Sequence, residues 1–219
     1  MIESPSPVIR LPHAPVLLLP NIVDRSICQR LIAYWESNDK EQGAVSTSRE
    51  GTDLKLDVKR REDVPLLDRD LSVIMRQAFL QRIVPAVRAA FQFEITQFET
   101  MRIGCYPAGG YFRAHRDNTT PYTCHRRFAV TLNLNTGDYE GGALRFPEFA
   151  SAPFEAPAGG AVVFSCSLLH EAFPVTRGRR FGLFTFLFDD AGAAHVRQML
   201  AAEAQRRPDF TSGAAVRRS

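Results

Sequence analysis

The feature that most constrains the fold is a series of short apolar or alternating segments between about residue 93 and residue 190. Six such segments, separated by turn residues, span 97–105, 111–115, 128–133, 143–146, 161–164 and 181–188. Fifteen of the sixteen phenylalanines lie between Phe79 and Phe188, so the main core is expected here. Many short strands with Gly- and Pro-rich turns are typical of a sandwich, barrel or jelly roll and not of alternating β-α units.

The first 92 residues show helical periodicity instead. Asp24 is a candidate N-cap for a helix that runs to about Glu36. Apolar residues recur at steps of three and four from about Asp68 to Ala90, which predicts a second helix. Pro85 removes a backbone donor inside that helix, so we expect a kink there or two shorter helices.

The remaining segments are shorter or more polar. A buried strand is expected over 14–19, and a mobile surface loop over 37–53, where the chain is polar and contains two glycines. Alternating apolar residues predict a half-exposed strand over 54–58. After the phenylalanine-rich region we expect a last helix over 195–204 and a disordered basic tail over 208–219.

Composition limits the class of protein. Lys and Arg number 27 against 24 Asp and Glu, and this net charge of +3 argues against a surface built throughout for nucleic-acid binding. Only three of the 27 basic residues are lysines, so the chain is rich in arginine, the side chain suited to bidentate carboxylate recognition. The four cysteines form no C-x-x-C pair, which favours a reducing compartment. With no apolar run near the ~20 residues of a membrane span and no signal-peptide pattern, a soluble cytoplasmic protein is expected.

Three residues stand out as a candidate metal site. On an extended strand His115 and Asp117 point to the same face, so both can reach one ion. His170 follows a predicted buried strand 53 residues after Asp117, and a jelly roll can bring it back beside the first strand. Two histidines and one carboxylate leave three octahedral positions open, which suits non-haem Fe(II) better than zinc.

Arg180 is the candidate for binding an anion. It opens the apolar strand over 181–188, where a buried guanidinium is costly without an anionic partner. A dicarboxylate could pair with it while chelating the metal through its other end. Gly182 lies two residues further on the same face and leaves room for a ligand, whereas Arg179 points to the opposite face.

These residues, taken in order, resemble a known family. The series His115-x-Asp117, Gly141-Gly142, His170 and Arg180 is similar to the Fe(II)/2-oxoglutarate-dependent dioxygenases, and within them to the prolyl-4-hydroxylase-like group. Two sequence segments support this resemblance: residues 104–107, before the first candidate ligand, and residues 170–180, which begin at the last one. The resemblance covers roughly residues 97 to 190.

The resemblance implies an α+β, mainly β fold with a double-stranded β-helix (jelly roll) core over 93–190. The strand and helices of 1–92 pack outside that core in a single structural domain, and 191–219 form a terminal helix and tail. The site residues implied are His115, Asp117 and His170 as iron ligands, Arg180 as the 2-oxoglutarate anchor, and Tyr106 in the co-substrate pocket. Many relatives carry a tyrosine where this chain has Asn133, which is expected to hydrogen-bond the 2-oxoglutarate.

The implied reaction is hydroxylation of an unactivated C–H bond, coupled to decarboxylation of 2-oxoglutarate to succinate. It uses Fe(II), 2-oxoglutarate and dioxygen, with ascorbate as a possible reductant. The substrate is a peptide or small molecule, and neither its identity nor the oligomeric state follows from the sequence. Two alternatives stay open: a non-catalytic metal-binding jelly-roll module, and a nucleic-acid demethylase of the same superfamily. The apolar character of 181–188 disfavours nucleic acid. His125 and His195 are not expected to take part in the chemistry.

Overall fold

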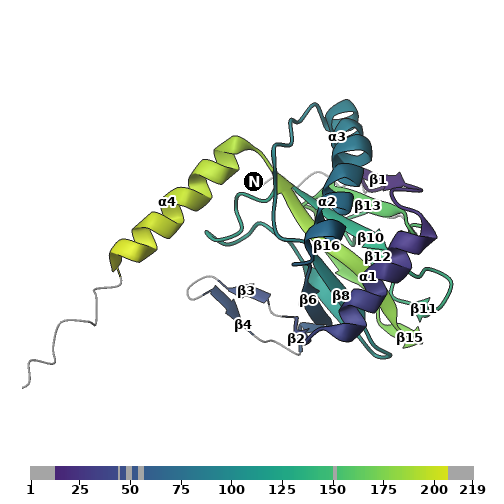
Figure 1. Ribbon diagram of the computed structural model, residues 1–219. Coiled ribbons are helices and arrows are strands. Elements are labelled where there is room, and N and C mark those ends of the chain that lie inside the picture. The colour runs from purple at the N-terminus through teal and green to yellow at the C-terminus, as the bar shows by residue number, and fades with distance from the viewer. Residues whose placement is uncertain (1–12, 44, 48–50, 54–56, 150–151, 207–219) are drawn as a thin grey trace, which may run out of the picture.

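Two antiparallel sheets face each other in the computed structural model of the chain (Figure 1), which describes residues 13–43, 45–47, 51–53, 57–149 and 152–206. The major sheet has the order β1-β13-β10-β16-β8-β6-β2, and β7 also pairs with β16. Its strands are β1 (Val16–Leu19), β13 (Ala161–Ser165), β10 (Phe128–Asn133), β16 (Arg180–Phe188), β8 (Arg102–Tyr106), β6 (Glu62–Pro65), β2 (Glu41–Gln42) and β7 (Gln97–Phe98).

The minor sheet lies opposite, with the order β12-β14-β9-β5. Its strands are β12 (Leu144–Arg145), β14 (His170–Ala172), β9 (Tyr111–His115) and β5 (Lys59–Arg60). Two further pairs complete the described strands: β11 (Glu140–Gly141) with β15 (Val175–Arg177), and β3 (Val45–Thr47) with β4 (Gly51–Asp53).

The chain alternates between the two sheets, and this confirms the predicted jelly roll. From β8 in the major sheet it passes to β9 in the minor one, returns to β10, and repeats the exchange through β12, β13, β14 and β16. β10 and β16 lie at the centre of the major sheet, covered on both faces, and all six residues of β10 are buried. Strands covered on both faces read as continuous apolar runs, which is why these two were visible in the sequence.

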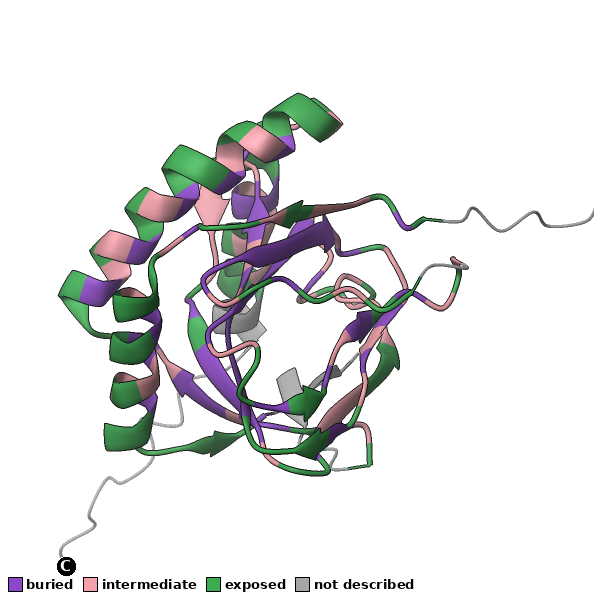
Figure 2. Ribbon diagram, turned by 90° about the vertical axis from the view of Figure 1, so that its right-hand side faces the viewer, coloured by how far each residue is buried: buried purple, intermediate pink, exposed green. Residues whose placement is uncertain are grey.

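Three helical segments cover the outer face of the major sheet. α1 (Arg25–Ser37) begins where predicted, with the Asp24 carboxylate accepting a hydrogen bond from the Ile27 amide at 2.9 Å. α2 (Arg69–Ala78) is capped in the same way by Asp68, which accepts from the Leu71 amide at 2.8 Å. The helices turn their buried residues toward the sheet and their exposed residues outward (Figure 2).

Pro85 has the effect expected of it. A five-residue π-helical turn, η1 (Phe79–Ile83), separates α2 from α3 (Val84–Phe91), and Pro85 lies in the first turn of α3. In the π turn the Val84 amide donates to the Phe79 carbonyl, five residues back. The wider turn accommodates the proline, which has no N–H and whose ring would collide with a carbonyl in a regular α-helix.

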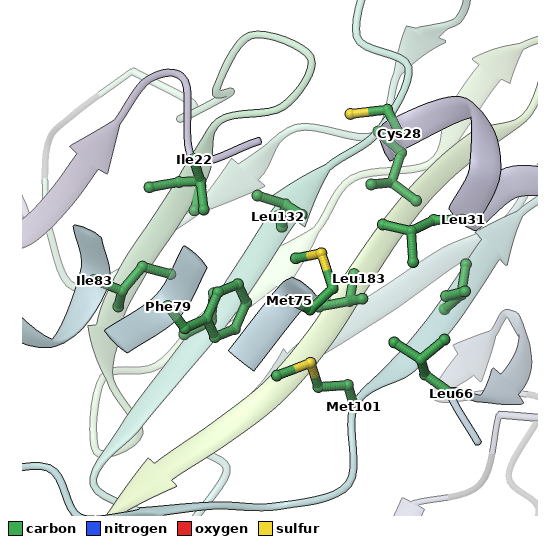
Figure 3. Close-up of a cluster of buried hydrophobic side chains, with 14 of the residues drawn as sticks. Ile22, Cys28, Leu31, Leu66, Met75, Phe79, Ile83, Met101, Leu132 and Leu183 are labelled. Atoms are coloured by element: carbon green, nitrogen blue, oxygen red, sulfur yellow. The ribbon is translucent and has the colours of Figure 1, made fainter. Parts of the chain in front are cut away.

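The main core lies between these helices and the major sheet. Phe79 and Met75 from the helices and Leu132 and Leu183 from the strands are fully buried there (Figure 3). Burying a side chain of this kind stabilises the fold by about 1.5–3 kcal/mol. The same packing closes the outer face of β10 and β16, so that only their inner face is left for a site.

Several predicted boundaries are wrong, mainly in polar segments. The segment expected as a loop over 37–53 contains β2, β3 and β4, because backbone pairing there does not depend on an apolar face. The strand expected over 97–105 is divided into β7 and β8. Of the strand expected over 54–58, residues 54–56 lie outside the described part, and the next strand begins at Lys59.

The two ends of the chain also differ from expectation. The terminal helix α4 (Asp190–Arg206) starts five residues earlier than predicted and projects from the end of β16 (Figure 1). The basic tail over 208–219 lies outside the described residues. The N-terminal part contributes strands to both sheets, namely β1, β2 and β6 to the major and β5 to the minor sheet. Over the ranges described, no helix combines the length and apolar character needed to cross a membrane.

Candidate metal centre and co-substrate pocket

The three predicted metal ligands converge between two strands of the minor sheet. His115 ends β9, Asp117 follows two residues later, and His170 begins β14. β9 and β14 are antiparallel, and their register places His115 directly opposite His170. One potential ligand atom from each residue lies within 4.8 Å of the other two.

Hydrogen bonds at the far side of each imidazole set its orientation. His115 Nδ1 donates to the Arg113 carbonyl at 2.7 Å, and His170 Nδ1 donates to the Leu168 carbonyl at 3.0 Å. A proton on each Nδ1 leaves the lone pair of Nε2 directed at the site, the arrangement typical of metal-binding histidines.

The Nε2 lone pairs face a carboxylate. His115 Nε2 lies 3.3 Å from one oxygen of Asp117, and His170 Nε2 lies 3.4 Å from the other. His115 Nε2 is buried, and none of the described residues forms a hydrogen bond with it. Lone pairs that converge on carboxylate oxygens repel unless a cation lies among them, so this donor set fits a divalent metal ion.

Burial and neighbouring charge hold the ligands in the forms that bind metal. Burial lowers the pKa of His170 more than the Asp117 carboxylate raises it, which favours the neutral imidazole. Burial opposes ionisation of Asp117, but His170 and His115 outweigh it and bring the pKa of that carboxyl below its usual range. Metal affinity requires a neutral imidazole and an ionised carboxylate, and the environment favours both.

Aromatic rings support the ligands from outside. The Phe112 ring stacks on His115 with centroids 3.5 Å apart, and the Phe164 ring meets His170 edge-on at 4.6 Å. These rings restrict the imidazoles to one orientation and keep that side of the site apolar.

Arg180, the first residue of β16, is a buried cation without a carboxylate partner among the described residues. Its side chain is 2% exposed, and its Nη2 donates to Asn133 Oδ1 at 3.2 Å. Nε and Nη1 are buried and have no hydrogen-bond partner in the described part of the chain. Arg179, in contrast, points outward and pairs with Glu36 at 2.7 Å. The predicted difference between the two arginines is therefore present, and Arg180 can accept an anionic ligand.

One cavity of about 850 Å³ contains the triad and the anion site together. Arg180 and Tyr106 line it along with the three metal ligands, whereas Asn133 is not among its lining residues. The expectation that Gly182 leaves room for a ligand is wrong. The Phe184 ring fills the space beside it, and a Cβ on Gly182 would lie 2.7 Å from that ring. That ring forms part of the cavity wall.

Sequence reasoning missed a buried charged cluster on the same wall. Arg61 pairs with both oxygens of Asp63, at 2.5 and 2.8 Å, and donates to the Tyr106 hydroxyl at 3.3 Å. Lys59 lies 3.4 Å from Asp63, and burial, followed by the charge of Arg61, lowers the pKa of Lys59 to about 8. All five residues of 59–63 are charged, and that run was the signal. In an extended segment Lys59, Arg61 and Asp63, which are two residues apart, point to the same side.

A second missed group lies nearer the mouth of the cavity. The Glu99 carboxylate accepts two bonds from Arg126, at 2.7 and 2.9 Å, and lies 2.8 Å from His125 Nε2. Arg126 lines the cavity with Glu99, whereas Arg145 is half-exposed. His195 lies outside the cavity lining, where its Nε2 is 3.1 Å from Cys124 Sγ.

Comparisons with known proteins agree with this geometry. Residues 101–188 match the family model described as the 2OG-Fe(II) oxygenase superfamily. Over this segment, which contains His115, Asp117, His170 and Arg180, the chain is similar to that superfamily. A PKHD-type hydroxylase of Pseudomonas fluorescens is 28% identical over 177 residues, covering 77% of this chain and 76% of the relative. A PKHD-type hydroxylase of Xanthomonas campestris pv. campestris is 27% identical and covers 93% of this chain and 87% of the relative.

Solved structures show the same fold. A prolyl hydroxylase of Trichoplax adhaerens, in complex with a hypoxia inducible factor peptide fragment, superposes with a TM-score of 0.67 at 17% identity over 82% of this chain and 86% of that one. A prolyl-4-hydroxylase of Pseudomonas putida gives 0.59 at 19% identity, over 80% and 92%. Together the comparisons support a prolyl-4-hydroxylase-like 2OG-Fe(II) oxygenase, and the family that the model describes implies Fe(II) and 2-oxoglutarate.

Proposed function

We propose that this 2OG-Fe(II) oxygenase hydroxylates an unactivated C–H bond of a peptide or small molecule and converts 2-oxoglutarate to succinate and carbon dioxide. One observation carries the proposal: a cavity of about 850 Å³ holds both a metal-binding triad and a buried arginine that has no carboxylate partner among the described residues. A non-catalytic metal-binding module has no need of that arginine.

In this assignment His115, Asp117 and His170 hold Fe(II). The ion would supply the redox chemistry that couples decarboxylation to oxidation of the C–H bond. The three ligand atoms lie within 4.8 Å of one another and their residues line the cavity, which suits an ion that must bind a co-substrate and dioxygen together. The carbonyls of Arg113 and Leu168 keep the Nδ1 protons in place and with them the tautomers that bind metal.

Arg180 would bind the carboxylate of 2-oxoglutarate that lies farther from the metal. Its two unpartnered nitrogens provide charge-assisted donors for that group. Tyr106, whose ring centroid lies 5.2 Å from the guanidinium carbon, forms the adjacent wall. The Tyr106 hydroxyl accepts from Arg61, which links this wall to the buried cluster of Lys59, Arg61 and Asp63.

The substrate class and the conditions of turnover belong to the same proposal. Relatives named hydroxylases, and a structural neighbour with a bound peptide fragment, support a peptide or small-molecule substrate. All four cysteines are free thiols, three of them buried, which favours a reducing, cytoplasmic location. Ascorbate would serve as an external reductant that returns oxidised iron to Fe(II) during uncoupled turnover.

The direct test is anaerobic titration of the protein with Fe(II) and then 2-oxoglutarate. We expect a weak visible charge-transfer band, and formation of succinate when air is admitted. His115→Ala should abolish both, whereas His195→Ala, which changes a histidine outside the cavity, should leave both intact. A well-folded wild-type protein that binds Fe(II) and shows neither the band nor succinate would refute the proposal.

A further inference from the structure

Asn133 occupies a position in which both ends of its side-chain amide are used by the protein. The residue ends β10, is 1% exposed and lies opposite Gly182 of β16. Its Nδ2 donates to the Ala156 carbonyl at 2.9 Å, and its Oδ1 accepts from Arg180 Nη2 at 3.2 Å. The carbonyl of Ala156 can only accept, so it fixes the amide with the oxygen toward the guanidinium.

The partner of Arg180 differs in charge from the partners of the other cavity arginines. Each of the other described arginines that line the cavity pairs with a carboxylate: Arg61 with Asp63, Arg102 with Glu41, Arg116 with Glu148 and Arg126 with Glu99. Among these five arginines, Arg180 alone lacks a carboxylate partner in the described part of the chain, and its acceptor is the neutral Asn133 Oδ1. A carboxylate in the place of Asn133 would neutralise the guanidinium and compete with any anionic ligand.

We infer that Asn133 is a positioning residue that holds the Arg180 guanidinium toward the cavity with a neutral oxygen and preserves its charge for the incoming carboxylate. Asn133 acts through Arg180, in place of the direct hydrogen bond to 2-oxoglutarate expected from the sequence. The inference rests on the proposed function, because it takes 2-oxoglutarate as the anion. It adds that this chain needs an uncharged acceptor at position 133.

The test compares Asn133→Asp, which has the same shape but adds a charge, with Asn133→Leu, which removes the hydrogen bonds. Binding of 2-oxoglutarate is measured by calorimetry on full-length protein loaded with redox-inert Mn(II), and the melting temperature is measured without ligand. We expect Asn133→Asp to bind Mn(II) normally and to bind 2-oxoglutarate about tenfold to a hundredfold more weakly. It should melt above Asn133→Leu, because an ion pair with Arg180 offsets part of the repulsion between the new carboxylate and the Ala156 carbonyl. Asn133→Leu should melt lower than wild type.

The double variant Asn133→Asp with Arg180→Met separates a positioning role from a general structural one. Without the guanidinium, the new buried carboxylate has no cationic partner, so Asn133→Asp should lower the melting temperature more in that background than in the wild-type background. Equal melting losses in both backgrounds, or wild-type 2-oxoglutarate affinity in Asn133→Asp, would overturn the inference. Failure of the wild-type protein to bind 2-oxoglutarate in the presence of Mn(II) would instead count against the proposed function.

Discussion

Gly142 offers a direct way to disturb the anion site without touching a polar group. Its φ of +72° lies in the left-handed region, and a Cβ there would meet Arg180 Cδ at 2.8 Å and Val175 Cγ2 at 3.0 Å. Gly142→Ala therefore has two effects. The backbone conformation alone costs about 1–2 kcal/mol, and the contact forces the stem of Arg180 to move.

Gly137 supplies the matched control. Its φ of +102° is also positive, but a Cβ there would have no heavy atom within 4 Å. Gly137→Ala should therefore lose only the stability that the backbone conformation costs, with no added loss from a side-chain contact. For a chain of this length about 1–2 kcal/mol corresponds to a fall of roughly 2–8 °C in melting temperature. We expect a fall of this size for Gly137→Ala and a larger one for Gly142→Ala.

The affinity for 2-oxoglutarate distinguishes the two variants. A shift of Arg180 that weakens one charge-assisted hydrogen bond costs about 1.5–3 kcal/mol, or roughly tenfold to a hundredfold in Kd. Calorimetry on the Mn(II)-loaded protein should show that loss for Gly142→Ala and a wild-type Kd for Gly137→Ala. The same Kd in both variants would show that the position of Arg180 does not control the pocket, and would refute the reasoning.

Three further results are expected. Asp63→Asn should lower the free energy of unfolding by about 3–5 kcal/mol in denaturant titration, because Arg61 then stays buried without its carboxylate. The control Glu148→Gln breaks an exposed ion pair and should lower it by at most about 1 kcal/mol. Equal losses in the two variants would contradict the argument that burial sets the cost. Lys59 has a pKa of about 8 in the folded protein against an ordinary 10.5, so the unfolded chain binds the extra proton between these values and stability due to Lys59 rises with pH across that window. Lys59→Met should lack that rise, and an unchanged pH profile would show that Lys59 is not buried as a cation. Finally, Asp117→Asn should abolish Mn(II) binding, measured by calorimetry, while the far-UV circular dichroism stays that of the wild type; retained binding would exclude Asp117 as a ligand.

The parts of the fold that could be predicted from the sequence are those whose pattern is local. Asp24 predicts the start of a helix because its carboxylate accepts a hydrogen bond from an amide only three residues away. Pro85 predicts an interruption because proline itself has no N–H group to donate. The central strands β10 and β16 were visible because both faces are buried. β2, with both residues exposed, has no such signature and is defined only by its pairing with β6.

The site divides in the same way. His115 and Asp117 could be paired from the sequence because a strand places every second side chain on one face, and the same rule separates Arg180 from Arg179. The Lys59–Arg61–Asp63 cluster obeys that rule too, but its place in the cavity depends on β5 and β6 joining β9 and β8. Strand neighbours more than forty residues apart follow from topology, which a single sequence does not contain.

The partner of an arginine is the clearest case of information that only the fold supplies. The sequence singles out Arg180 as a candidate for binding an anion, but it does not give the partner of Arg61, Arg126 or Arg180. In the structure two of them are held by carboxylates, at 2.5 and 2.7 Å, and the third by an amide oxygen at 3.2 Å. A guanidinium that already pairs with a carboxylate has its charge neutralised and serves as part of the cavity wall. One that has only an amide keeps its charge, so the ability to bind an anion depends on Asn133 as much as on Arg180 itself.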